Sequence, residues 1–160
     1  MRKSTARMMR VAMVVFSYYP ADLRVRREAE ALVDAGMQLD VICLRNDSER
    51  KNEIINGVKI YRLPIKRRRA GKWYYFWDYT YFTILTFFVL TKFYMRKRYR
   101  FVHVHNMPDQ LVFTALIPKL CGSKLILDLH DPMPEVYMAK YSIKSSHPII
   151  SLLIFLEKLS

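Results

Sequence analysis

The feature that most constrains the fold is an unbroken run of apolar residues at positions 11–16. A strand that is apolar at every position is typical of a strand covered on both faces, as in a parallel sheet. The residues that follow predict a loop and then a helix, with Asp22 placed to cap its start and Gly36 to end it. A second apolar strand is predicted at residues 39–44, and the length of the crossover favours parallel pairing of the two strands.

Strands and helices continue to alternate along the rest of the chain. Three more strands and two more helices are predicted, the strands at residues 58–63, 101–104 and 124–129 and the helices at 109–120 and 148–159. Pro118 is expected to break the last turn of the first of these helices. The polar residues 46–56 are predicted to form a loop. This order of elements predicts an α/β fold with a doubly wound, mostly parallel sheet and helices on both faces.

Composition and charge narrow the class of protein. The chain has 160 residues, which is enough for one domain with a real core, and a formal net charge of +13. Twelve basic residues and one acid lie between Ile54 and Arg100. Such a block is typical of a protein with an anionic partner, namely phospholipid, nucleic acid or a phosphorylated substrate. A solvated basic face without any partner is the alternative.

Cysteine usage and the N-terminus bear on the compartment. Cys43 and Cys121 lie far apart in apolar runs, so we expect both to be buried, reduced thiols. The apolar run near the N-terminus is too short for the core of a signal peptide. We therefore expect a cytoplasmic protein.

Ligands of open α/β sheets bind at the carboxyl ends of the strands, so the loops there are candidate sites. After the first strand, Arg24, Arg26 and Arg27 fall in the first turns of the predicted helix, where the helix dipole disfavours cations. The alternative is surface pairing, because Arg24 with Glu28 and Arg26 with Glu30 both have the i, i+4 spacing of helical ion pairs. We favour the surface pair for Arg26 and contact with an anionic substrate for Arg24 or Arg27.

The strand at residues 101–104 carries a second group of candidates. His103 and His105 lie on the same side of this strand, because side chains alternate along it. We interpret the mid-strand His103 as a core histidine. His105 and Asn106, at the end of the strand, are expected to face a binding cleft.

The third candidate is the loop at residues 128–135, which holds three acids, a histidine and two prolines. A stiff polar loop at a strand end suits acid–base or hydroxyl-binding groups. The alternative is that Asp128 and His130 only cap neighbouring turns. A metal site shared with His103 and His105 is disfavoured, because the two parts lie on different strands and no further His or Cys cluster supports them. We also find no phosphate-binding glycine motif after the first strand.

Residues 18–44 and 100–137, in this order and spacing, resemble the family 4 glycosyltransferases of the GT-B fold, and more finely those that build bacterial surface polysaccharides. The resemblance implies two Rossmann-like halves that face each other across a cleft. The N-terminal half binds the acceptor, and the C-terminal half binds most of the nucleotide-sugar. We expect residues 1–160 to be the N-terminal half, truncated near its end, with the donor-binding domain absent and the chain inactive alone.

The resemblance also implies roles for individual residues. His130 matches the histidine near the reacting sugar, and Asp131 and Glu135 would line the acceptor side. Many relatives carry two glycines in the first loop for contact with the donor; residues 18–21 here are Tyr-Tyr-Pro-Ala, so we assign no donor contact to them. The family retains anomeric configuration and needs neither a metal nor a cofactor besides the nucleotide-sugar co-substrate.

Residues 66–98 contain many aromatic residues, with basic residues at both ends. Because acceptors in this family are often lipid-linked, the resemblance implies that this segment acts at the inner membrane face. Its uncharged run at residues 79–91 is about thirteen residues, short of the roughly twenty that span a bilayer, so we expect it to lie on the membrane. The alternative is that the helix packs its aromatic side chains on the sheet. The residues assigned to the membrane surface are Lys66, Arg67, Arg68, Arg69, Trp73, Trp77, Arg96, Lys97 and Arg98.

Two functions of other classes compete with the transferase. A non-catalytic, membrane-associated accessory module is favoured by the lack of a donor-binding half. A nucleic-acid binder is suggested by charge alone. RNA-binding sheets expose aromatic side chains on one face, whereas these strands are predicted to be buried on both, so we expect no nucleic-acid partner.

Overall fold

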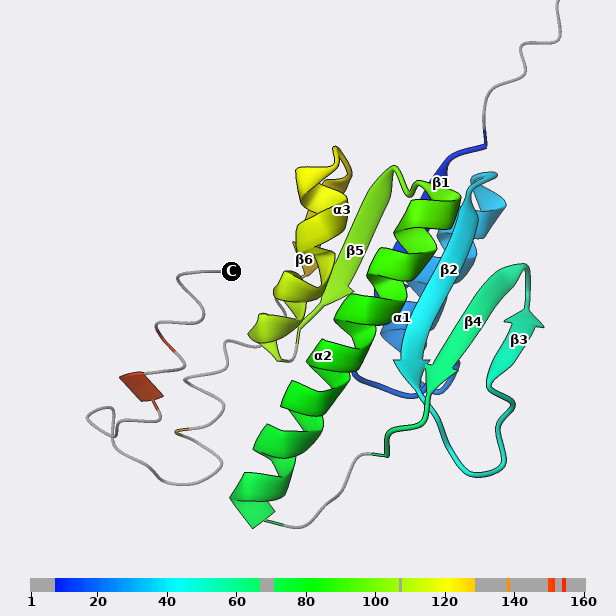
Figure 1. The fold of residues 1–160 in the computed structure, drawn as a ribbon. Helices are drawn as coiled ribbons and strands as arrows, with labels where there is room; N and C mark the ends of the chain where they lie inside the picture. The colour runs from blue at the N-terminus through cyan, green and yellow to red at the C-terminus, as the bar shows by residue number, and fades with distance from the viewer. Residues whose placement is uncertain are drawn as a thin grey trace, which may run out of the picture.

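The computed structural model of the protein describes residues 8–66, 71–106 and 108–128, with the backbone alone for 71–76, and the isolated residues 138, 150, 151 and 154. Its centre is a six-stranded sheet in the order β3-β4-β2-β1-β5-β6 (Figure 1). All neighbouring strands pair in parallel except β3 and β4. The strands are β1 (Arg10–Val14), β2 (Gln38–Leu44), β3 (Asn52–Ile55), β4 (Val58–Leu63), β5 (Phe101–His105) and β6 (Lys124–Asp128).

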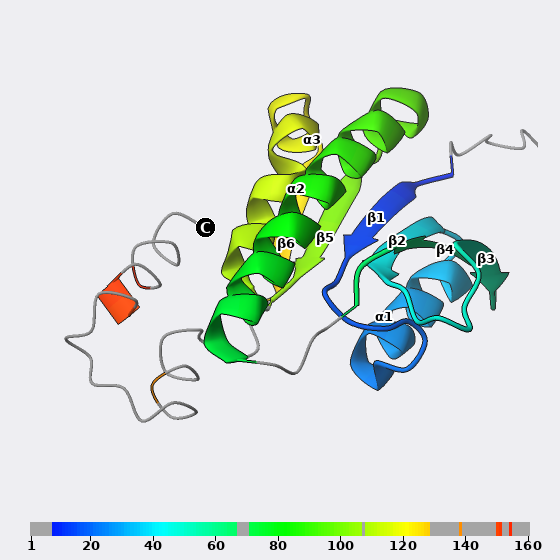
Figure 2. The same ribbon diagram turned by 60° about the horizontal axis from the view of Figure 1, so that its bottom comes forward.

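Helices cover both faces of this sheet. They are α1 (Leu23–Asp34), α2 (Gly71–Lys97), the 3₁₀ helix η1 (Asp109–Ala115) and α3 (Leu116–Leu120). α1 lies on one face, and α2, η1 and α3 lie on the other (Figures 1 and 2). Val11 and Met13 of β1 pack in the α1 layer, whereas Ala12 and Val14 pack in the α2 layer. The predicted doubly wound α/β fold is confirmed.

The ends of α1 follow from two residues. The side chain of Asp22 accepts a hydrogen bond from a backbone N–H of the first turn, at 3.3 Å. Gly36 follows the helix with a φ of 84°, a conformation that glycine adopts without strain. Its N–H donates to the carbonyl of Val33, and the N–H of Met37 donates to the carbonyl of Leu32, which closes the last turn. Both predicted helix ends are confirmed.

The structure corrects the prediction of a loop over residues 46–56. Its last part forms β3, which pairs with β4 through a tight turn at Asn56 and Gly57. These two residues have φ values of 49° and 79°, as a two-residue hairpin turn of type I′ requires. The Asn-Gly pair is a strong hairpin signal in the sequence. The strand before this turn was not predicted, because it is short and begins with polar residues.

The predicted helix at residues 109–120 is divided between η1 and α3. Pro118 lies in the first turn of α3, where its missing N–H costs no hydrogen bond, so it does not break the last turn. Of the two cysteines expected to be buried, one is and one is not. Cys43 is buried, which raises the pKa of its thiol to about 12, but Cys121 is exposed.

Arg62 of β4 is a buried cation that holds several segments together, although the sequence placed it in the basic block. Its side chain is 1% exposed and contacts the carboxylates of Glu53 at 2.8 Å and Glu49 at 3.4 Å. It also donates to the backbone carbonyls of Tyr19 and Arg50. Arg62 therefore joins the loop after β1, the loop after β2 and strand β3 around one charge.

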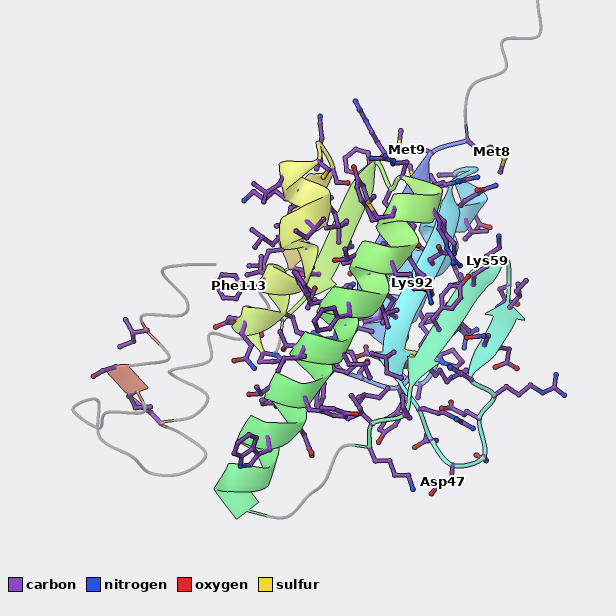
Figure 3. All side chains as sticks on the ribbon, viewed as in Figure 1. Met8, Met9, Asp47, Lys59, Lys92 and Phe113 are labelled. Atoms are coloured by element: carbon purple, nitrogen blue, oxygen red, sulfur yellow. The ribbon has the colours of Figure 1, made fainter. Side chains whose placement is uncertain are left out.

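We expect Arg62→Ala to lower the free energy of unfolding by about 2–4 kcal/mol, because it removes buried hydrogen bonds while the partly exposed carboxylates regain water. Urea denaturation measures this loss. Lys59→Ala is the matched control, since Lys59 lies exposed on the same strand (Figure 3) and should change stability by less than about 0.5 kcal/mol. Equal effects of the two substitutions would contradict the structural role of Arg62.

Candidate functional site

The order of the strands locates the binding edge of the sheet. From β1 the chain crosses through α1 to β2 on one side, whereas β5 and β6 lie on the other side of β1. The connections therefore reverse direction between β1 and β5. Open α/β sheets bind ligands at such a reversal, at the carboxyl ends of the strands. In this protein those ends are Val14 of β1 and His105 of β5.

A group of four polar side chains lies at this edge, on the α1 face of β5 and β6. We call Glu28, His103, His105 and Asp128 the His–carboxylate cluster. His105 Nδ1 lies 3.2 Å from a carboxylate oxygen of Asp128, and His105 Nε2 lies 3.6 Å from Glu28 Oε2. His103 Nδ1 lies 3.8 Å from the same oxygen of Glu28, and the two imidazole rings are tilted with centroids 4.3 Å apart. The cluster thus joins α1, β5 and β6.

Two further polar residues follow β5 at the same edge. Asn106 and Asp109 are both buried. The N–H of Asn106 donates to the backbone carbonyl of Asp128 at 2.9 Å, which extends the pairing of β5 and β6 by one residue. Buried carboxylate, amide and imidazole groups at the carboxyl edge can accept and donate hydrogen bonds to a ligand rich in hydroxyl groups.

The arginines of α1 have separate environments. Arg26 pairs with Glu30 at 3.0 Å, which confirms the predicted surface pair. Hydrogen bonds from Asn56 and then Arg26 hold the pKa of the Glu30 carboxyl below its usual value. Arg24 is exposed and lies 3.8 Å from Asp22 rather than against Glu28. Arg27 is exposed and makes no ion pair within the described part of the chain.

The structure brings together some of the predicted site residues and leaves others untested. His105 and Asn106 lie at the predicted edge. His130, Asp131 and Glu135 lie outside the described residues. Glu28 and His103 were not predicted as site residues, because Glu28 was considered only as a partner of Arg24 and His103 as a core residue. The sequence did hold one signal for His103, which is its position on the same side of β5 as His105.

α2 presents apolar side chains to the sheet and also away from it. Tyr79, Phe82 and Tyr94 are buried, so the alternative of aromatic packing on the sheet holds for part of the helix. Other large apolar side chains form an exposed stripe that we call the outer stripe of α2: Trp77, Tyr81, Ile84, Phe88 and Met95. Among the residues that the structure describes, no helix combines the length and the apolarity needed to cross a membrane.

The basic residues assigned to the membrane surface differ in their contacts. Arg96 and Arg98 are exposed at the end of α2, and Arg98 stacks over the ring of Tyr94. Lys97 instead donates to the buried Asp40 and to Tyr61, so its charge is compensated within the fold. Lys66 pairs with the exposed Asp47. Arg67, Arg68 and Arg69 and the side chain of Trp73 lie outside the described residues, and Trp77 belongs to the outer stripe.

Comparison with known proteins agrees with this architecture. The family model described as a glycosyl transferase 4-like domain matches residues 21–159. The structure of sucrose-phosphate synthase from Thermosynechococcus elongatus is similar with a TM-score of 0.64 at 12% identity, over 94% of this chain and 39% of that one. A Glycyrrhiza uralensis protein solved in complex with glycyrrhetinic acid 3-O-monoglucuronide is similar with a TM-score of 0.53 at 13% identity, over 86% of this chain and 31% of that one. No curated protein matches the sequence.

The two structural similarities establish the fold. At such low identity, the two structures show a shared fold and nothing about substrates. The chain spans well under half of the length of each of them. The fold shown is the Rossmann-like half of a GT-B glycosyltransferase.

Proposed function

We propose that this chain, which belongs to the glycosyl transferase 4-like family, forms the acceptor-binding half of a retaining, hexosyltransferase-like glycosyltransferase. The donor would be a nucleotide-sugar held mainly by a second Rossmann-like domain, and no other cofactor would be required. The observation that carries this proposal is the set of buried polar groups at the carboxyl edge of β5 and β6. The family assigns that edge to the cleft, and its groups match the hydroxyls of a saccharide.

The acceptor side is the better assignment for this half because of what the edge contains. His105, Asn106 and Asp109 place imidazole, amide and carboxylate groups at this edge, whereas residues 18–21 supply no glycine through which a backbone could approach a phosphate. By the resemblance to the family, His130 would lie near the reacting sugar, and Asp131 and Glu135 would line the acceptor side. Arg24 or Arg27 would contact an anionic group of the acceptor.

We further propose that the acceptor is lipid-linked, belongs to bacterial surface polysaccharide or glycolipid synthesis, and is met at the inner membrane face. The support is the outer stripe of α2 and its basic flanks. Trp77 and Phe88 are each 64% exposed, and tryptophan and other aromatic side chains favour the membrane interface. Basic residues beside an anionic leaflet contribute about 1 kcal/mol each. Arg96 and Arg98 are exposed at the C-terminal end of the helix, so positive charge lies beside that end of the apolar stripe.

The first test concerns the acceptor. The chain alone should bind a prenyl-diphosphate-linked saccharide in micelles but transfer no hexose to it from UDP- or GDP-sugars, because the main donor contacts belong to the other domain. Arg27→Ala should weaken binding about tenfold, as expected for loss of one charged hydrogen bond. Arg26→Ala is the matched control, since Arg26 is already paired with Glu30. Robust transfer by the chain alone, or equal effects of both substitutions, would contradict the assignment.

The second test concerns His130 in an enzyme that contains both domains. His130→Ala should lower kcat by roughly 10²–10³-fold, the usual effect of losing one preorganised contact with the transition state. The circular dichroism spectrum should not change. Lys59→Ala, which changes an exposed side chain on β4, serves as the control and should leave kcat unaltered. A rise in KM with an unchanged kcat would show that His130 binds substrate without acting in the transition state.

The third test concerns the membrane. The chain should float with phosphatidylglycerol-containing liposomes, and salt should weaken the association by screening the basic residues. Trp77→Ser with Phe88→Ser, or replacement of Lys66, Arg67, Arg68 and Arg69 by glutamine, should each weaken it at least about tenfold. Ile54→Ser removes an exposed apolar side chain from β3 and should have no effect. Flotation that is indifferent to salt and to these changes would refute the proposed membrane surface.

A further inference from the structure

The His–carboxylate cluster has the composition and spacing of a metal site. One donor atom from each of Glu28, His103, His105 and Asp128 lies within 4.8 Å of all the others. We propose that this cluster binds one divalent transition-metal ion of the Zn²⁺ class. The sequence argued against such a site because its parts lie on different strands. The fold pairs His105 with Asp128 across β5 and β6 and adds Glu28 from α1.

The donor types select the class of ion. Two imidazoles and one carboxylate suit Zn²⁺, Co²⁺ or Ni²⁺, whereas Mg²⁺ and Ca²⁺ prefer oxygen ligands alone. In a tetrahedral zinc site with bonds of about 2.0–2.1 Å, neighbouring donor atoms lie about 3.3 Å apart. Glu28 Oε2 lies 3.6 Å from His105 Nε2 and 3.8 Å from His103 Nδ1. Shifts of a few tenths of an ångström in flexible side chains would bring these distances into that range.

Asp128 acts on the site through His105. A carboxylate oxygen of Asp128 lies 3.2 Å from Nδ1, and its negative charge favours a proton on that nitrogen. Nε2 then carries the lone pair, and it lies 3.6 Å from Glu28 Oε2. A carboxylate that orients a ligating histidine is the usual second contact of metal-bound imidazoles. We therefore assign Glu28, His103 and His105 as ligands and Asp128 as a positioning residue.

The carboxylate of Glu28 gives an independent reason for a cation here. Its Oε2 atom is buried and accepts no hydrogen bond from any described residue. Both nearby imidazole nitrogens lie beyond hydrogen-bond distance from it. A buried carboxylate oxygen without a close donor is costly, and a bound cation would compensate it. The rest of the Glu28 side chain is partly exposed, which leaves a path for an ion to enter.

A metal in this position would tie α1 to β5 beside the binding edge. This goes beyond the proposed transferase function, which requires no metal, and either proposal can fail without the other. The three ligands of the chain would fill three coordination positions of the ion. The fourth position would be open to an oxygen atom of solvent or of a bound ligand.

The test uses the untagged, metal-free chain titrated with Zn²⁺ and Co²⁺ alone. We expect one ion per chain, visible Co²⁺ absorption bands of low-coordinate geometry, and a rise in Tm on the order of 5–10 °C at a hundredfold excess over Kd. Mg²⁺ should not compete. Glu28→Gln should abolish tight binding without harming the fold, because this partly exposed side chain keeps its shape. Asp128→Asn should weaken binding by about 10–100-fold.

Two controls locate the ion. Cys121→Ser removes the exposed thiol and should bind Zn²⁺ like the unaltered chain. Asp34→Asn removes a carboxylate from the other end of α1 and should also bind normally. The proposal is overturned if no stoichiometric binding occurs. It is equally overturned if Glu28→Gln and His105→Ala, shown to be folded, retain the affinity of the unaltered chain.

Discussion

The burial of β1 on both faces is the constraint on which the rest of the structure depends. β1 pairs in parallel with β2 on one side and β5 on the other, and its side chains pack alternately toward α1 and α2. A strand of this kind needs a helical layer on each face, because either face left open would expose apolar surface. Reversal of the chain connections at β1 then follows, and with it the position of the binding edge beside the carboxyl end of β5.

The basic charge of the chain is divided between the interior and the surface. Arg62 is neutralised by Glu49 and Glu53, and Lys97 by Asp40, so these cations stabilise the fold rather than attract a partner. The carboxyl of Asp40 also accepts from the hydroxyl of Tyr99, and burial is the main cause that raises the pKa of that hydroxyl. What remains on α2 for an anionic surface, among the described residues, is a smaller set of exposed cations toward its C-terminal end, which includes Lys92 and Arg96. The number of basic residues between Ile54 and Arg100 therefore overstates the number of cations that a membrane would meet.

The two candidate surfaces lie on opposite sides of the sheet. The His–carboxylate cluster belongs to the α1 face of β5 and β6, and the outer stripe belongs to the helix that covers the other face (Figure 2). The sheet separates them, so contact of α2 with lipid would leave the cluster uncovered. The carboxyl edge is adjacent to both. An acceptor anchored in a bilayer could therefore reach this edge while the α1 face stays accessible to solvent ions.

The sequence by itself determined the parallel sheet, most strand positions, the caps of α1 and the membership of the glycosyl transferase 4-like family, because continuous apolar runs, capping residues and ordered motifs are local signals. It also placed His105 and Asn106 at a strand end. Only the tertiary structure decided that Glu28 meets His103 and His105, that Arg62 and Lys97 are compensated within the fold, and that α2 leaves apolar side chains outside. These facts depend on which residues distant in the sequence become neighbours. Periodicity cannot specify that, because it fixes the face of an element but not what packs against it.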